Sequence, residues 1–217
     1  MFSLSLDEFL SVLASYNLAI WPIQIFAYIA VIAALFFSFK ASRSSVRIVL
    51  AILSVLWLFT GIVFCLIYWS PSHFFGYGFG ICCILQGLLF AYGTIKSDIA
   101  AGARNTAYTV IGILFVVYAA LGYQVFGYYL GHIYPKFFAV GLVPCPTTIL
   151  TFGIFLIISG KIPIKYLVIP VLISLGGILA VYEGIYEDVG LIIAGISGAI
   201  LIMLRDAEIH TRVSSNT

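Results

Sequence analysis

The chain has 217 residues, of which 63% are hydrophobic and only 8% are charged, and its mean hydropathy is +1.19. A soluble domain of this size carries about 25% charged residues, so the composition excludes an ordinary soluble protein. The formal net charge of +2 indicates neither an acidic partner nor a nucleic acid. We therefore expect one all-α domain over residues 1–217, an integral membrane bundle whose partner is the lipid bilayer.

Residues 1–18 are expected to form a short amphipathic helix at the membrane interface. Ser5 and Glu8 have the spacing of a capping box, in which each side chain accepts a free amide of the other residue. Helical spacing places four apolar side chains on one face: Leu6, Phe9, Leu10 and Leu13. A frayed extension of the first span is the alternative.

Seven transmembrane helices are expected within residues 19–204, each an apolar run long enough, or nearly so, to cross a hydrocarbon core of ~30 Å. The predicted spans are Trp21–Phe39, Val46–Trp69, His73–Ile95, Thr106–Phe126, Pro146–Gly160, Pro163–Val181 and Asp188–Leu204. Residues 205–217 are expected to form a cytoplasmic tail.

The basic residues orient this bundle, because such residues near span ends are retained in the cytoplasm. With seven spans, Lys136 alone falls on one side of the membrane. The other side receives Lys40, Arg43, Arg47, Lys96, Arg104, Lys161, Lys165, Arg205 and Arg212. We therefore expect the N-terminus outside and the C-terminus inside, in a cell inner (cytoplasmic) membrane.

The most distinctive segment is Pro144-Cys145-Pro146-Thr147-Thr148. Pro146 suits the first turn of a helix, because its missing amide proton is not needed there. A helix from Pro146 to Gly160 would measure about 22 Å, which is shorter than the ~30 Å core. Extended backbone must cover the remaining depth, sheltered by protein or a watery cavity. In transporters, a short proline-interrupted span of this kind indicates a binding site.

The start of this helix also has a defined chemistry. A helix N-terminus can bind an anion or lower the pKa of a neighbouring thiol, and Cys145 stands there. The predicted orientation brings further polar groups to the same outer half. The candidate solute-binding residues are His132, Tyr134, Cys145, Thr147, Thr148, Glu183 and Asp188.

Each of these residues also has a purely structural interpretation. Cys145 can pack as a small apolar residue, and His132 can bond to a backbone carbonyl of its loop. The acidic turn that contains Glu183, Glu187 and Asp188 can be a solvated cap on two helices. Cys145 and His132 are weak metal candidates, because no pair has C-x-x-C or H-x-x-H spacing. No metal or cofactor is therefore assigned.

The predicted spans contain no Asp, Glu, Lys or Arg near their centres. Ion-coupled carriers, proton pumps and voltage sensors usually need such groups. The three histidines form no H-E-x-x-H motif. We therefore expect neither energised transport nor an enzyme.

Several motifs extend over nearly the whole chain: Tyr16-Asn17 with Trp21-Pro22, Trp57 with Thr60-Gly61, Gly131-His132 with Tyr134-Pro135, Pro144 to Ile149 with Phe152-Gly153, and Asp188 to Leu191 with Ala194-Gly195. Together they resemble an uncharacterised prokaryotic family of multi-pass membrane proteins of unknown function, sometimes labelled permease-like. The resemblance implies a shared fold and a bacterial or archaeal cell membrane, and no particular activity.

The leading hypothesis is that a small solute or ion is bound, or passes passively, through an outward-facing pocket at the start of the fifth helix. One alternative is a thiol-redox or metal-handling role for Cys145, with His132 and one of Cys82 and Cys83. The other is a non-catalytic accessory subunit that scaffolds further membrane proteins.

Overall fold

The structure, a computed structural model, describes residues 5–96, 99 and 106–214. Within these residues every regular element is a helix, which confirms the predicted all-α class. The elements are α1 (Leu6–Ala19), α2 (Ile23–Ser38), α3 (Arg43–Phe59), η1 (Thr60–Trp69), α4 (Phe75–Lys96), α5 (Thr106–Val117), η2 (Tyr118–Gly122), α6 (Tyr123–Tyr129), α7 (Pro144–Ile157), η3 (Ile164–Tyr166), α8 (Val168–Tyr182) and α9 (Asp188–Ser214).

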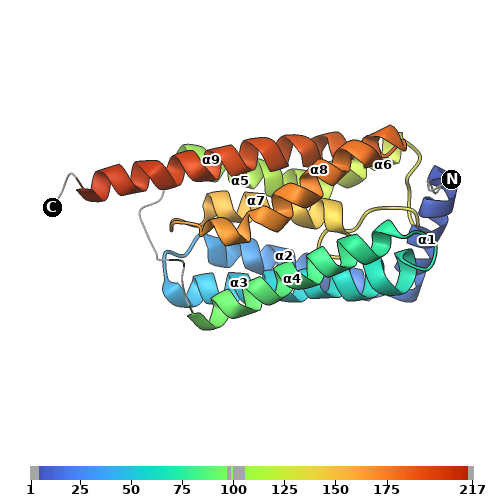
Figure 1. The fold of residues 1–217 in the computed structure, drawn as a ribbon, viewed down its shortest axis with the longest axis horizontal. Helices are drawn as coiled ribbons and strands as arrows, with labels where there is room; N and C mark the ends of the chain where they lie inside the picture. Colours follow the sequence, from blue (N-terminus) through green and yellow to red (C-terminus); the bar gives the residue numbers. More distant parts are fainter. Residues whose placement is uncertain (1–4, 97–98, 100–105, 215–217) are drawn as a thin grey trace.

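The long helices run along one axis, and α1 lies across the end of the bundle opposite the C-terminus (Figure 1). Five continuous segments are long and apolar enough to cross a membrane, or six if α1 and α2, which meet at 87°, form one broken span. The five are Arg43–Trp69, Phe75–Lys96, Thr106–Tyr129, Ile164–Tyr182 and Asp188–Glu208. Each predicted span coincides with a helical segment, but α9 continues past the expected end at Leu204.

The outer surface of the bundle is apolar, which is the reverse of a soluble protein. Large hydrophobic side chains such as Phe26, Ile32, Val55, Leu114 and Ile193 are each more than half exposed. Monomeric soluble proteins rarely expose extended apolar surface, and membrane proteins present it to lipid. The surface and the five long apolar helices identify a membrane protein.

The N-terminal helix α1 has the predicted capping box. The Ser5 amide donates to Glu8 Oε2 at 2.9 Å, and the Glu8 amide donates to Ser5 Oγ at 3.4 Å. Its apolar face packs on other helices of the bundle. The Phe9 ring packs 6.3 Å from the ring of Phe64 and 5.6 Å from that of Trp69. The sharp turn before α2 folds this face onto the end of the bundle.

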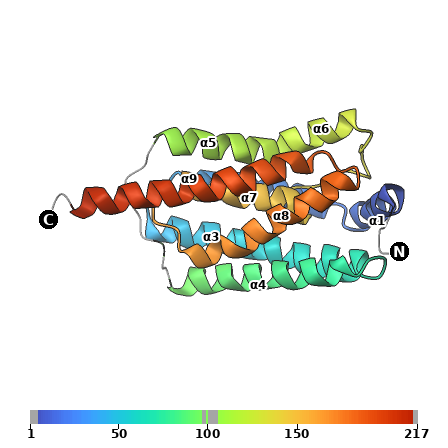
Figure 2. The ribbon, with the colours of Figure 1, turned by 45° about the horizontal axis from the view of Figure 1, so that its top comes forward.

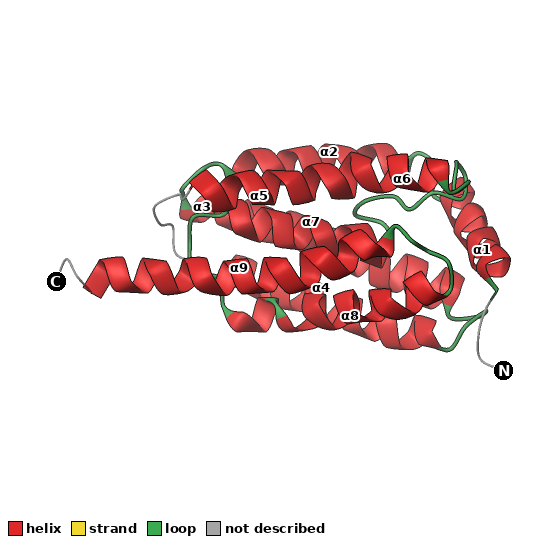
Figure 3. Ribbon diagram, turned by 90° about the horizontal axis from the view of Figure 1, so that it is seen from above, coloured by secondary structure: helices red, strands yellow, loops and turns green. Residues whose placement is uncertain are grey.

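The short helix α7 lies at the centre of the bundle, between α5 and α6 on one side and α4 on the other (Figures 2 and 3). Its 14 residues span about 21 Å. All of them are buried except Cys145, which is half-buried. The helix begins at Pro144 rather than at Pro146, because Val143 has the extended geometry of an N-cap and neither proline needs an amide donor in the first turn.

The other end of α7 is capped by Arg205 of α9, which was predicted to belong to the cytoplasmic basic group but is only 3% exposed. Its guanidinium donates to the carbonyl oxygens of Phe155, Ile158 and Gly160 at 2.5, 2.8 and 3.0 Å. It also pairs with Asp206 at 2.7 Å, and Asp206 accepts the amide of Ile162 at 2.8 Å. The fork of donors on one arginine therefore satisfies carbonyls that the helix leaves free.

Candidate functional site

The chain approaches α7 as an irregular segment, residues 130–143, whose last six residues are buried. Polar side chains from other elements donate hydrogen bonds to backbone carbonyls of this segment, which has no regular structure to supply them. The side-chain amide of Asn17 donates to the backbone carbonyls of Pro135 and Phe137 at 2.7 and 2.8 Å. The side-chain amide of Gln124 donates to the backbone carbonyl of Phe138, and the Tyr16 hydroxyl donates to that of Leu142. Irregular backbone in an apolar bundle is thus sheltered by protein, as the sequence predicts.

The hydroxyls of Thr147 and Thr148 serve this same entry. Thr147 Oγ1 donates to the Val143 carbonyl at 2.6 Å and accepts the Gly141 amide at 2.9 Å. Thr148 Oγ1 donates to the Pro144 carbonyl at 2.8 Å. Both threonines are fully buried in the first turn of α7.

A buried carboxylate, Asp188 at the start of α9, faces the start of α7. Cys145 Sγ donates to Asp188 Oδ2 at 3.2 Å, and the Tyr123 hydroxyl donates to Asp188 Oδ1. Tyr123 directly follows η2, one of the two π-helical stretches in the described chain. Such stretches occur frequently at functional sites. Three elements, α6, α7 and α9, therefore meet at one carboxylate.

A second buried carboxylate lies next to the first in sequence. His132 Nδ1 and Glu187 Oε1 are 2.5 Å apart, and both side chains are buried. This contact replaces the backbone bond considered for His132. The interpretation of the acidic turn as a solvated cap is wrong for Glu187 and Asp188, whose side chains are fully buried, and it fits only Glu183, which is exposed. Donors from α6, α7 and the preceding loop bond three of the four carboxylate oxygens, and Glu187 Oε2 is buried without a hydrogen-bond partner.

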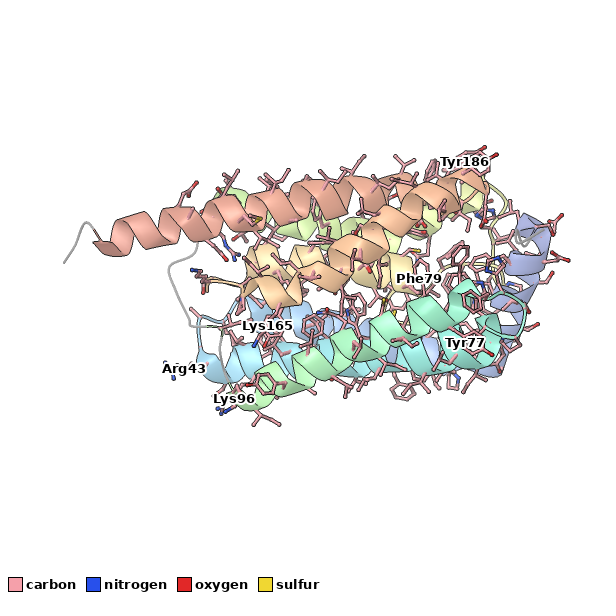
Figure 4. The ribbon with its side chains drawn as sticks, in the orientation of Figure 1. Arg43, Tyr77, Phe79, Lys96, Lys165 and Tyr186 are labelled. Atoms are coloured by element: carbon pink, nitrogen blue, oxygen red, sulfur yellow. The ribbon has the colours of Figure 1, made fainter. Side chains whose placement is uncertain are left out.

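A cavity of about 80 Å³ adjoins Cys145 and Asp188. Phe79 of α4 points toward α8, where its ring packs on Gly176 (Figure 4). The other π-helical stretch, η1, contributes Phe64 and Trp69 to the lining of the cavity. The cavity is lined by aromatic and aliphatic side chains and by four residues that can carry charge or donate a proton: His73, Cys145, Glu183 and Asp188.

The structure brings together part of the predicted set. Cys145, Glu183 and Asp188 line the cavity, whereas His132, Thr147 and Thr148 lie near it without lining it. Tyr134 is 53% exposed and stands apart from the cavity, with its ring against that of Phe137.

Sequence reasoning missed Tyr123 and the role of Glu187. The signal for Tyr123 is a hydroxyl within an apolar span, because a buried tyrosine needs a hydrogen-bond partner. The weak metal candidates Cys145 and His132 bond to different carboxylates. Within the part of the chain that the structure describes, no group of three or more His, Cys, Asp or Glu side chains is placed to hold a metal ion.

The comparisons with known proteins identify a family and no activity. Residues 6–212 match a family of unknown function, DUF6064. No curated protein matches the chain, and no solved structure matches it. The match agrees with the resemblance to an uncharacterised family that the motifs indicate.

Proposed function

We propose a function for this chain, which belongs to the DUF6064 family of unknown function. It is a seven-span protein of a prokaryotic inner (cytoplasmic) membrane, with its N-terminus outside and its C-terminus in the cytoplasm. It binds a small solute or ion, or lets one pass, at an outward-facing cavity beside the start of α7. The role is binding or passive passage rather than catalysis, and no nucleic acid takes part.

The distribution of charge along the bundle supports this orientation. Arg43, Lys96 and Lys165 lie at the end where the C-terminus emerges, as Figure 4 shows. The cavity and α1 lie toward the opposite end, because Phe9 of α1 lines the cavity. Basic residues are retained in the cytoplasm, so the cavity faces outside. Arg104 lies outside the described residues.

One observation carries the proposed site. In α7, every residue is buried except Cys145, and Cys145 lines the cavity together with Asp188. The central helix of the bundle thus contributes Pro144 and Cys145 to the wall of the cavity, and of the two only Cys145 is incompletely buried. The same cavity reaches the exposed Glu183, so a solute can enter from the surface. Concave sites with a few convergent polar groups in an apolar lining are the usual form of small-molecule sites.

Cysteine labelling tests this proposal. In a variant that retains only Cys145, a membrane-impermeant maleimide added to right-side-out vesicles is expected to modify the thiol. The matched control retains only Cys82, which is half-buried but does not line the cavity, and it should not be modified from outside. Absence of Cys145 labelling from either side of the membrane would contradict an accessible cavity.

A thiol function is the second candidate, and the contact between Cys145 and Asp188 favours it. A carboxylate within hydrogen-bond reach of a thiol, itself held by Tyr123, has the geometry of a nucleophile with an oriented base. The substitution Cys145→Ser separates the two proposals. A solute site should keep most of its affinity, because serine can donate the same hydrogen bond. A thiol function should be lost entirely.

A further inference from the structure

The charged groups that line the cavity are acidic. Asp188 lies at its buried end and Glu183 at its exposed end, and no Lys or Arg of the described chain lines it. His73 also lines the cavity, and its Nδ1 accepts the amide N–H of Phe75 at 3.3 Å. The N-terminus of α7 contributes only about half a positive charge. The electrostatic environment therefore favours a cation over an anion.

Asp188 is the fully buried acidic group of this arrangement. Each of its two oxygens accepts a hydrogen bond, one from Tyr123 and one from Cys145. Each carboxylate oxygen has two lone pairs, so both retain one for a further donor. In the described part of the chain no Lys or Arg lines the cavity beside Asp188, so a bound cation would supply its counter-charge.

The remaining lining consists largely of aromatic rings. Three of them, Phe9, Phe64 and Trp69, lie within 5.6–6.3 Å of one another between ring centroids. Phe9 is at 88° to Phe64 and at 72° to Trp69, so ring faces point in different directions. A cation within about 6 Å of a ring centroid is attracted by the electron density on the face, and groups of such rings recognise substituted ammonium ions.

Resting on the proposed function, we propose that the solute of this cavity is a small organic cation: an ammonium group with apolar substituents. Asp188 supplies the counter-charge at the buried end, the aromatic rings contact the substituents, and Glu183 attracts the cation at the entrance. A plain metal ion would leave the aromatic lining without a partner, and a neutral solute would supply no counter-charge to Asp188.

Two probes of the same shape test the charge preference. In 3,3-dimethylbutan-1-ol a neutral carbon takes the place of the positively charged nitrogen of choline. Isothermal titration of the full chain in lipid nanodiscs is expected to show choline binding at least about tenfold more tightly, as cation–π attraction with desolvation implies. Asp188→Asn should weaken choline binding about tenfold or more and leave the alcohol unchanged. Asp7→Asn removes the same charge on the exposed side of α1, outside the cavity, and should change neither affinity.

The outcomes separate this inference from the function on which it rests. Equal affinity for choline and the alcohol overturns the cationic class while a solute site remains. Failure of both probes to bind, and to slow maleimide labelling of Cys145, overturns the solute site as well. If Asp188→Asn does not fold, the exposed Glu183→Gln replaces it, with an expected several-fold loss of choline affinity. Unchanged choline affinity in that variant also overturns the cationic class.

Discussion

Two glycines set the distance between α5 and α7. A Cβ atom on Gly153 would lie 2.7 Å from the carbonyl oxygen of Gly112 and 3.0 Å from the amide nitrogen of Val116. A Cβ atom on Gly112 would lie 2.6 Å from the carbonyl oxygen of Gly153. These neighbours are backbone atoms, which no side-chain rotation can move away. Small residues at such crossings let membrane helices pack through close van der Waals contact.

The substitution Gly153→Ala should therefore force α7 away from α5. We expect the free energy of unfolding to fall by about 1–3 kcal/mol, as for other overpacked cores. Thermal unfolding of the detergent-solubilised protein measures this as a lower midpoint. Gly78→Ala is the matched control, because a Cβ atom there meets nothing within 4 Å. Equal midpoints for the two variants would show that the helix contact tolerates a methyl group.

At the scale of the element, α7 is a helix too short to cross the membrane, with both of its ends buried. Threonine hydroxyls satisfy the backbone at its start, the side-chain amide of Asn17 satisfies the segment before it, and Arg205 satisfies carbonyls at its end. Buried backbone groups without partners cost free energy comparable to a lost hydrogen bond. Polar partners therefore hold the buried backbone at both ends of α7.

Replacing the cap by Arg205→Met should destabilise the protein by about 3–5 kcal/mol, because it leaves the buried Asp206 charge without its partner. The carbonyls of Phe155 and Gly160 also lose their donor. Lys161→Met, at an exposed position of the same end, should change stability little. Denaturation in mild detergent with increasing sodium dodecyl sulfate compares the two. A loss in Arg205→Met no larger than in Lys161→Met would argue against the cap.

At the scale of the whole molecule, the bundle has an apolar exterior and two ends of different charge. The end that bears α1 has the acidic Asp7, Glu8 and Glu183 exposed. The opposite end has the exposed Lys40, Arg43, Arg47, Lys96 and Lys161. This asymmetry, together with the positive-inside rule, supports the proposed outward orientation of the cavity.

Cysteine accessibility checks the orientation directly. In a variant without native cysteines, Ser5→Cys at the start of α1 should react with an impermeant maleimide in right-side-out vesicles. Lys161→Cys should react only after the membrane is permeabilised, because the α7–α8 turn lies at the basic end. Both positions are exposed, so burial does not explain a difference. The reverse pattern would place the cavity in the cytoplasm.

Much of the architecture follows from local features of the chain. Apolar runs locate the helices, Ser5 and Glu8 locate the start of α1, and the prolines around Cys145 place the start of α7 within two residues. These features depend on nearest neighbours, on hydrophobic periodicity and on the backbone restrictions of proline. The shortness of α7 and the need to shelter the segment before it are likewise readable from the residues.

The partners of the polar residues come only from tertiary structure. Tyr123, Cys145 and Asp188 are far apart in the chain, and nothing in their spacing says that three helices meet at one carboxylate. The burial of Glu187 beside His132, and of Arg205 beneath α7, likewise depends on which helix faces which. Sequence alone determined a helical membrane protein with an unusual entry to one short helix. Packing decided which charges are buried, because a charged side chain can leave water only where distant residues supply its hydrogen bonds.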